Sequence, residues 1–471
     1  MAQIVSPATQ NLDQVLASQR AAFAAQPYPD LRTRRRHLKD LRLALIRRQE
    51  DFATAIGKDF GYRSRLEVLY SEVFVSVHAL RNAEANVGRW MQRREVDVDL
   101  PLQFGSAWVM PQPVGVVGVI SPWNYPIYLA MGPLAGALAA GNRVMLKPSE
   151  FTPATSALLA EVIGATFAPD HVAVVQGGVE TGMEFSRLAF DHLLFTGSTA
   201  VGRKVMQAAA PNLTPVTLEL GGKSPALLAP DANLARAADD LIYGKLLNAG
   251  QTCIAPDYVL VRRGERARLV ELLRRAALQR YAAGADELTS IINGSQFERL
   301  SCYLREAEAA GVEIVPLCDS AATDAGRRRM APCLLLDPPE HLAVMRDEIF
   351  GPILPIVSYD SFDQALEYVN ARPRPLALYL FASSDRTIER VLKGTIAGGV
   401  CINDTLVHIV AEDLPFGGIG ASGIGHYHGK AGFDTFSKAK PVFHRRGLGI
   451  GVMLRPPYGR LHEWMLKFLI R

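Results

Sequence analysis

Apolar residues are spaced along the chain in two distinct ways. From about residue 30 to residue 90, leucine, isoleucine and valine recur three or four positions apart, which predicts helices. Beyond residue 110 the pattern changes to short apolar runs, rich in β-branched residues and separated by helical stretches. These runs are Val114–Ile120, Arg143–Leu146, His171–Val175 and His192–Phe195. Such alternation predicts a parallel sheet with crossover helices.

A second alternating region begins near Ser224. Its strand-like runs are Ala226–Leu228, Tyr258–Arg262, Ile314–Pro316, Cys333–Leu336 and Ile353–Ser358, and its helical patterns are Leu234–Asn248 and Glu265–Gln279. No low-complexity linker separates the two regions, so we place the boundary near Gly222, at a tight crossover. We therefore predict an α/β fold in which a parallel-sheet domain precedes a second α/β domain.

Composition agrees with a folded, enzyme-sized protein. Of 471 residues, 49% are hydrophobic and 21% are charged, which argues against disorder and is close to the globular average. The formal net charge is +4 and is spread along the chain, apart from a small group of arginines within residues 32–36. We therefore expect no nucleic-acid partner.

The cysteine pattern and the N-terminal sequence indicate the cellular compartment in which the protein is expected. Five cysteines lie far apart, without a CxxC pair or a histidine at metal spacing, so neither a disulfide framework nor a metal site is expected. The N-terminus lacks the basic and apolar segments of a signal peptide. The uncharged stretch Leu100–Asn142 is broken by prolines and is predicted to be buried strand and helix, not a membrane span. A cytoplasmic protein without an integral membrane segment is the expectation.

Cys253 is the first candidate for chemistry. It follows a glycine-bearing turn in NAGQTC, where a thiol can face a cleft, although a lone cysteine is more often a buried apolar residue. Upstream, Glu219 stands in an apolar, strand-like run that opens into Gly221 and Gly222. Burial there would raise the pKa of the carboxyl group toward the range of a general base.

Two further turns follow predicted strands. Asn124 lies between prolines at the carboxyl end of the first strand, where α/β sites are built, and is either an oxyanion donor or a turn former. Gly197–Gly202 follows a strand and opens a helix at Arg203–Ala209. Its backbone N–H groups and the Ser198 hydroxyl suit a pyrophosphate, and the alternative is an ordinary helix cap by Ser198 or Thr199.

Seven motifs, in this order and spacing, resemble those of the aldehyde dehydrogenase superfamily. They are PWNYP at Pro122–Pro126, KPSE at Lys147–Glu150, FTGSTAVG at Phe195–Gly202, LELGGKSP at Leu218–Pro225, GQTC at Gly250–Cys253, EIFGP at Glu348–Pro352 and LPFGGIGASGIG at Leu414–Gly425. The likeness covers about residues 33 to 443. Gly398–His408 and His428–Phe443 are most similar to the class 3 branch and its bacterial coniferyl aldehyde dehydrogenases, followed by fatty aldehyde dehydrogenases.

The resemblance implies NAD(P)-dependent oxidation of an aldehyde to the carboxylic acid. Cys253 would attack the aldehyde carbon, and the Asn124 amide and the Cys253 N–H would hold the resulting oxyanion. Hydride transfer to nicotinamide would leave a thioester, which water activated by Glu219 would hydrolyse. Glu348 is implied as a ligand of the nicotinamide ribose and as an alternative base.

The resemblance also implies the cofactor contacts. They are Trp123, Lys147, Glu150, Gly197, Ser198, Val201, Gly202, Leu220, Gly221, Glu348 and Phe350. A carboxylate at Glu150 would bind the adenosine ribose and repel a 2′-phosphate, which favours NAD over NADP. The class 3 branch accepts both cofactors, so NADP stays possible.

The resemblance implies the aldehyde dehydrogenase-like fold, with a Rossmann-type parallel-sheet cofactor domain, an α/β catalytic domain and small bridging strands. Residues 1–94 and 111–222 would form the cofactor domain, 223–417 the catalytic domain, and 95–110 with 437–455 a bridging element that makes a homodimer. The C-terminal LHEWMLKFLIR has its apolar residues at helical spacing. This amphipathic helix is expected to pack on the protein or a dimer mate, and contact with a membrane surface is the alternative.

The substrate is the least determined part. Coniferaldehyde or a related aromatic aldehyde is the first hypothesis and a medium- or long-chain aliphatic aldehyde the alternative, because Trp123, Tyr125, Tyr70 and Ile254 are expected to line an apolar tunnel suited to either. Two other classes compete: a cysteine hydrolase or acyltransferase without a nucleotide, and an inactive structural relative. The intact Cys253, Glu219 and Asn124 argue against the second.

Overall fold

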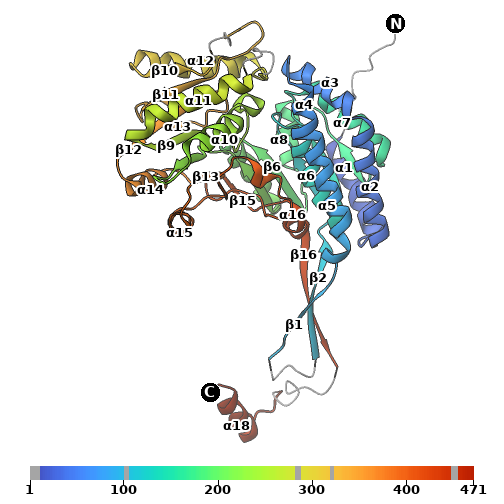
Figure 1. Ribbon diagram of the computed structural model, residues 1–471. Coiled ribbons are helices and arrows are strands. Elements are labelled where there is room, and N and C mark those ends of the chain that lie inside the picture. The colour runs from blue at the N-terminus through green and yellow to red at the C-terminus, as the bar shows by residue number, and fades with distance from the viewer. Residues whose placement is uncertain (1–10, 100–104, 282–287, 319–322, 447–454, 471) are drawn as a thin grey trace, which may run out of the picture.

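The computed structural model describes residues 11–99, 105–281, 288–318, 323–446 and 455–470. Two α/β lobes lie side by side, and a long, thin arm of strands leaves the molecule between them (Figure 1). The N-terminal helices cover the outside of one lobe, and the C-terminal helix lies at the far end of the arm. The α/β fold predicted from the sequence is confirmed.

The first lobe is built on a six-stranded sheet with the order β15-β7-β6-β3-β4-β5. Its parallel strands are β3 (Val116–Ile120), β4 (Arg143–Lys147), β5 (Val172–Val174), β6 (His192–Gly197) and β7 (Val216–Leu220), and β15 (Gly423–Ile424) pairs antiparallel with β7. Its helices are α6 (Tyr128–Ala140), α7 (Pro153–Thr166), α8 (Val179–Ser186) and α9 (Thr199–Ala209). The parallel sheet expected from the four apolar runs is present.

A group of helices precedes this sheet. They are α1 (Leu12–Ala25), α2 (Leu31–Arg47), α3 (Gln49–Phe60), α4 (Arg65–Val68), the π-helix η1 (Leu69–Phe74) and α5 (Val75–Trp90). α2 begins where the Asp30 side chain accepts a 2.8 Å hydrogen bond from the Thr33 N–H. The helices predicted over residues 30–90 are confirmed, and α1 adds one that the pattern did not reveal.

The second lobe has a seven-stranded sheet with the order β10-β11-β12-β9-β8-β13-β14. The strands are β8 (Pro225–Leu228), β9 (Tyr258–Arg262), β10 (Glu313–Pro316), β11 (Cys333–Leu336), β12 (Ile353–Tyr359), β13 (Ala377–Phe381) and β14 (Gly399–Ile402), of which β10 pairs antiparallel. The helices are α10 (Leu234–Leu246), α11 (Arg266–Tyr281), α12 (Gly294–Ala309), α13 (Ala343–Arg346), α14 (Phe362–Asn370) and α15 (Asp385–Gly394). The five strands predicted here are present, within a residue or two of their expected ends.

The crossover between the sheets is short. Only Gly221–Ser224 separate β7 from β8, and Gly222 has a φ of +152°. The chain later returns to the first sheet, because β15 places Gly423 opposite Glu219. The division of the chain into residue ranges for two domains stays a prediction.

The arm is a three-stranded antiparallel sheet with the order β1-β2-β16. Its strands are β1 (Arg94–Val96), β2 (Gly105–Pro113) and β16 (Ser437–Arg445), and α16 (Gly429–Thr435) precedes it. Residues 100–104 and 447–454 of the predicted bridging element lie outside the described residues.

α18 (Arg460–Leu469) confirms the predicted C-terminal amphipathic helix. Its side chains Leu461, Trp464 and Phe468 are exposed in the single chain. In the part of the chain that the structure describes, we find no helix with the length and apolar character needed to cross a bilayer.

Candidate active site

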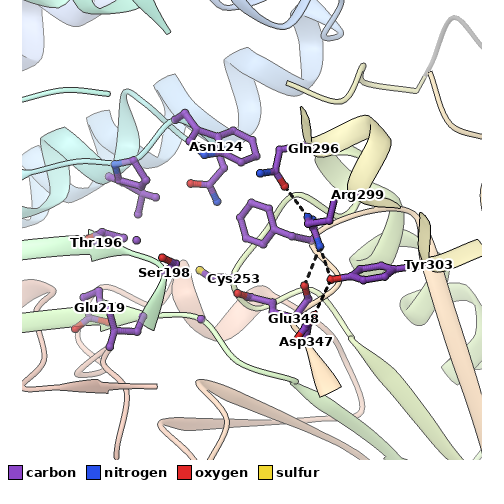
Figure 2. A pocket seen from close by; sticks show the side chains of 17 residues that line it. Asn124, Thr196, Ser198, Glu219, Cys253, Gln296, Arg299, Tyr303, Asp347 and Glu348 are labelled. Carbon is purple, nitrogen blue, oxygen red and sulfur yellow. Dashed lines mark hydrogen bonds between the residues drawn. The ribbon is translucent and has the colours of Figure 1, made fainter. Parts of the chain in front are cut away.

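Cys253 lies where two hollows of the molecule meet. Both lobes contribute to the walls of a wide cleft, with Asn124, Thr196 and Glu219 on one side and Arg299 and Glu348 on the other (Figure 2). A second hollow, which we call the apolar chamber, is lined by Tyr70, Ser71, Val75, Tyr125, Tyr128, Leu129, Tyr243, Leu247, Thr252, Cys253, Ile254, Leu406, Val407, Ile409 and Val410. Cys253 and Leu129 line both, so the thiol is accessible from the cleft and from the chamber.

A strained turn presents this thiol. After α10, the short 3₁₀ segment η4 (Leu247–Gly250) contains three successive residues with positive φ: Asn248 at 52°, Ala249 at 52° and Gly250 at 75°. Asparagine and glycine tolerate this conformation, whereas alanine pays a steric cost for it. A Cβ at Gly250 would also lie 2.4 Å from the Gly351 carbonyl oxygen. The turn is therefore held by its surroundings and not by local preference.

Hydrogen bonds from two buried amide side chains keep the turn in this conformation. Asn248 Nδ2 donates to the carbonyl oxygen of Asn124 at 2.9 Å and to that of Gln251 at 3.2 Å. Gln251 Nε2 donates to the Ser290 carbonyl oxygen at 3.1 Å, and its Oε1 accepts the Ile292 N–H at 2.9 Å. This network ties the cysteine turn to the Asn124 turn of the other lobe.

Asn124 points its side chain toward Cys253 (Figure 2). Its Nδ2 donates to the Gln251 carbonyl oxygen at 3.1 Å. An amide nitrogen carries two N–H groups, so the second one is left for the oxyanion of a substrate whose carbon is bonded to the sulfur. The backbone of the turn is fixed by Arg63, which donates to the Asn124 carbonyl oxygen at 3.0 Å and forms a fully buried ion pair with Glu72 at 3.0 Å. Asn124 is thus both a turn residue and suitably placed for the predicted donor role.

The Cys253 thiol is protonated in this arrangement. Burial raises its pKa well above the usual range, and the nearby carboxyl groups of Glu348 and Glu219 raise it further. The backbone N–H groups of Cys253 and Ile254 act in the opposite direction. Those N–H groups are the local device that favours a thiolate.

Glu219 is a buried carboxyl group on β7. It is only 3% exposed, and within the described residues neither of its side-chain oxygens has a hydrogen-bond partner. Burial raises its pKa well above the ordinary value, as the sequence predicted. Such a group becomes a base only when water or substrate enters and solvates its charge.

Glu348 is the second carboxyl group of the cleft. Burial raises its pKa to about 8, with a further contribution from Asp257, while the Gly222 N–H, Lys223 and Arg299 lower it. A Cβ at Gly221 would lie 2.1 Å from Glu348 Oε2, so only glycine allows the carboxyl group to rest there.

The loop that carries Glu348 is anchored to the crossover. Lys223 pairs with Asp257, and its Nζ donates to the Val344 carbonyl oxygen at 2.8 Å and to that of Asp347 at 2.9 Å. Asp257 Oδ1 accepts the Ile349 N–H at 3.0 Å. These contacts explain why a lysine directly follows the two glycines of the crossover.

The predicted cofactor residues fall into two groups. Trp123, Gly197, Ser198, Leu220, Gly221, Glu348 and Phe350 line the wide cleft, whereas Lys147, Glu150, Val201 and Gly202 do not. Lys147 and Glu150 form an ion pair of 2.9 Å at the end of β4.

The segment before α9 is a helix cap as well as a candidate phosphate site. The Ser198 side chain accepts the Val201 N–H at 3.4 Å, which confirms the ordinary-cap alternative for Ser198. Gly202 is buried, and a Cβ there would lie 2.6 Å from a methyl group of Leu220. That glycine is therefore needed for close packing of α9 on β7.

Sequence reasoning missed one wall of the cleft. Gln296, Arg299 and Tyr303 project from α12, and the Arg299 guanidinium donates to the Ile349 carbonyl oxygen at 2.8 Å and to that of Glu348 at 3.3 Å (Figure 2). Arg299 is held in turn by Gln296 Oε1 at 2.8 Å and the Tyr303 hydroxyl at 3.0 Å. A helical residue with no motif around it carries no signal that would have revealed this role.

One residue of the predicted tunnel is on the wrong side. Tyr70, Tyr125 and Ile254 line the apolar chamber, but Trp123 lines the wide cleft, with its ring 5.3 Å from that of Phe350. In the apolar chamber, the Tyr125 hydroxyl forms a hydrogen bond of 2.7 Å with the Thr252 hydroxyl. Pro122, Trp123 and Asn124 line the wide cleft, whereas Tyr125, the next residue, lines the apolar chamber.

Comparison with known proteins gives a consistent result. A family model described as "Aldehyde dehydrogenase family" matches residues 1–442. A protein of Pseudomonas aeruginosa named "Probable coniferyl aldehyde dehydrogenase" is 48% identical over 98% of this chain and 96% of its own, and the "Coniferyl aldehyde dehydrogenase" of a Pseudomonas species is 46% identical over 90% and 89%.

Solved structures agree with the fold. The substrate-bound AldH of Staphylococcus aureus is 36% identical, with a TM-score of 0.91 over 97% of this chain and 99% of that one. Matching structures of 29% and 26% identity are described as an NAD-dependent aldehyde dehydrogenase and as an NADP-dependent enzyme.

Proposed function

The chain belongs to the aldehyde dehydrogenase family, and from this premise we propose that it oxidises coniferaldehyde or a related aromatic aldehyde to the acid, with NAD as the preferred cofactor. Oxidation of an aldehyde to the carboxylic acid is the activity of the family branch that the chain matches. The observation that carries the proposal is the position of Cys253 between the wide cleft and the apolar chamber. A thiol at this junction can hold an aldehyde from one side while a hydride acceptor lies on the other.

Cys253 is the proposed nucleophile. The thiol gives up its proton to water in the cleft, and the thiolate sulfur forms a bond to the aldehyde carbon while the carbonyl π electrons move to oxygen. The resulting oxyanion accepts hydrogen bonds from the free Asn124 N–H and the Cys253 backbone N–H. A nicotinamide held in the wide cleft, where Gly221 and Glu348 would contact it, would supply the acceptor for the hydride that leaves this carbon. The product on the protein is a thioester between the acyl group and Cys253.

Glu219 is the proposed base for hydrolysis of the thioester. Both of its oxygens are free of partners among the described residues, so a water entering the cleft can bind to them. The carboxylate takes a proton from this water, whose oxygen attacks the thioester carbon. The C–S bond then breaks and the acid leaves, and the proton on Glu219 passes to the Cys253 thiolate and restores the thiol. Glu348 has a backbone N–H partner at Gly222 and contacts Gly221, which suits a positioning role on the cofactor better.

The wide cleft has the features that a nicotinamide dinucleotide needs. Gly221 leaves room for close approach, and Glu348 Oε1 is buried without a hydrogen-bond partner in the described structure, as a ribose acceptor would be before ligand binding. The start of α9, capped by Ser198, suits the pyrophosphate. The carboxylate of Glu150, beside Lys147, favours NAD because it would repel a 2′-phosphate.

The remaining proposals concern organisation. We keep residues 1–94 with 111–222 as the cofactor domain, 223–417 as the catalytic domain, and the arm as the element that joins two copies in a homodimer. The arm supports this because β1 and β16 are edge strands with exposed side chains. A cytoplasmic location is supported by Cys253, Cys302, Cys333 and Cys401, none of which forms a disulfide in the described structure.

The test is a substrate survey. Reduced cofactor would be followed with coniferaldehyde, benzaldehyde and a series of straight-chain alkanals, each with NAD and with NADP. We expect the highest kcat/KM for coniferaldehyde with NAD. A kcat/KM that rises with alkyl length and exceeds that of coniferaldehyde would contradict the proposal and favour a fatty aldehyde dehydrogenase.

A further inference from the structure

The apolar chamber contains a small set of polar side chains among its hydrophobic ones. Besides Cys253, the lining residues that carry a hydroxyl group are Tyr70, Ser71, Tyr125, Tyr128, Tyr243 and Thr252. Four tyrosines around one narrow hollow are more than an apolar tunnel needs, since phenylalanine would fill the same space. The position of each hydroxyl decides whether it is available to a ligand.

Most of these hydroxyls are already committed to the protein. The Tyr125 and Thr252 hydroxyls meet each other at 2.7 Å. The Tyr128 hydroxyl meets His428 Nε2 at 3.0 Å. Ser71 Oγ donates to the Glu67 carbonyl oxygen at 2.7 Å. Each of these groups would lose a hydrogen bond by turning to a ligand.

Tyr70 and Tyr243 are different. Burial raises the pKa of the Tyr243 hydroxyl, and the charge of Tyr70 and a side-chain hydrogen bond with Tyr70 raise it further, so these two hydroxyls are neighbours. The Tyr125–Thr252 pair is buried, whereas this pair includes the exposed side chain of Tyr70 and can be reached by a ligand that enters the chamber. A phenol hydroxyl is protonated at neutral pH and can both donate and accept a hydrogen bond. The two hydroxyls thus form a polar spot in the chamber, whose other lining groups are apolar or already hydrogen-bonded within the protein.

This polar spot lies toward the outer end of the chamber. Tyr70 is 51% exposed and marks the mouth with Val407, which is 46% exposed, whereas the lining residues Ile254 and Leu129 are buried. Tyr243 is half-buried on α10, one turn before the cysteine turn. Tyr70 stands in the π-helix η1, and its ring stacks on Phe74 at a centroid distance of 6.1 Å. Widened turns of this kind often occur at functional sites.

We propose that Tyr70 and Tyr243 bind the ring hydroxyl of a hydroxyaryl aldehyde while its carbonyl carbon meets Cys253. This inference rests on the proposed function and adds a determinant of specificity to it. In a flat, conjugated 4-hydroxycinnamaldehyde the phenol lies at the opposite end from the aldehyde. When the aldehyde is at the inner thiol, the phenol is consequently directed outward, where these two hydroxyls offer a donor and an acceptor. An alkanal has nothing to bind there.

The experiment compares two substrates that differ only by the ring hydroxyl: 4-hydroxycinnamaldehyde and cinnamaldehyde. The measured quantity is the ratio of their kcat/KM values in the wild type, Tyr243→Phe, Tyr70→Phe and the double variant. We expect the ratio to fall about fivefold in Tyr243→Phe, the size of one neutral hydrogen bond, and further in the double variant, mainly through KM for the hydroxylated substrate.

Tyr125→Phe is the matched control, because it removes a hydroxyl of the same chamber that is already bonded to Thr252. Whatever it does to the rates, the ratio should stay at the wild-type value. An unchanged ratio in Tyr243→Phe, Tyr70→Phe and the double variant would overturn the inference.

The same data separate this inference from the proposed function. A wild type that prefers alkanals, with a ratio that still falls in the variants, would refute the aromatic substrate and keep the hydroxyl site. A wild type that prefers coniferaldehyde, with a constant ratio, would refute the hydroxyl site alone. No turnover of either cinnamaldehyde would refute both.

Discussion

Glu219 and Cys253 line the same cleft, and Glu219 contributes, after burial and Glu348, to the raised pKa of the Cys253 thiol. Two negative charges in one dry site are unfavourable, so the carboxylate and the thiolate oppose each other's ionisation. Burial raises the pKa of Glu219, so this carboxyl group stays protonated in the dry cleft and ionises when water enters and solvates its charge. The entry of water is also the moment at which a hydrolytic base is needed.

Substitution of Cys253 and substitution of Glu219 should affect different steps of the reaction. Cys253→Ala should lower turnover more than about a thousandfold, because no bond to substrate can form. Glu219→Gln should keep a rapid first release of reduced cofactor and slow the following hydrolysis by about a hundredfold. Stopped-flow absorbance would resolve the two phases. Normal turnover in Glu219→Gln would move the base role to Glu348 or to water alone, and Glu348→Gln is the comparison variant.

The thiol should respond to the same substitution before any substrate is present. Because Glu219 raises the Cys253 pKa, Glu219→Gln should shift the pH profile of alkylation by iodoacetamide to lower pH. The rate of loss of activity at a series of pH values measures the shift. A profile that stays in place, or moves to higher pH, would show that the two groups are not coupled.

Glu348 should make stability depend on pH. Its pKa is about 8 in the folded chain against an ordinary value of 4.5, so the folded state binds the proton more tightly than the unfolded state. This contribution is complete below pH 4.5 and is lost as the pH rises through about 8. The free energy of unfolding of the wild type should therefore fall more steeply than that of Glu348→Gln over this window. Denaturant titrations at several pH values test it, and parallel curves would contradict the raised pKa.

Gly221→Ala should damage the cofactor site without unfolding the protein. The new Cβ would lie 2.1 Å from Glu348 Oε2 and must displace that carboxyl group. We expect the KM for NAD to rise about tenfold or more, since displacements of this size are costly in a preorganised site. Gly57→Ala is the control, because a Cβ there meets no atom within 4 Å. Equal KM values in the two variants would argue against contact between Glu348 and the cofactor.

Much of this site could be predicted because its motifs are turns with strict local needs. Gly250 needs a positive φ and close approach to Gly351, Gly221 needs space beneath Glu348, and both glycines stand in runs that the sequence marks clearly. The parallel sheets were also predictable, since their strands are uninterrupted apolar runs.

The parts that could not be predicted depend on contacts between distant elements. Arg299 is one arginine among many on amphipathic helices, and only the folded chain brings it to the carbonyl oxygens of Glu348 and Ile349. Trp123 and Tyr125 are separated by one residue, and no sequence pattern told which hollow each would enter. The strands β13 and β14 were missed, although β13 is apolar throughout.

The pairing of β15 with β7 has a consequence for biosynthesis. Glu219 lies on a strand whose outer neighbour is Gly423–Ile424, a segment made some two hundred residues later. While the second lobe is being synthesised, β7 is an edge strand with unpaired backbone N–H and C=O groups. Such an edge can pair with strands of other chains. In a fragment ending at residue 222 that edge would never be paired. We therefore expect the fragment to aggregate more readily than the whole chain under the same conditions. The residue proposed to finish each catalytic cycle thus lies on a strand whose neighbour is among the last parts of the protein to be synthesised.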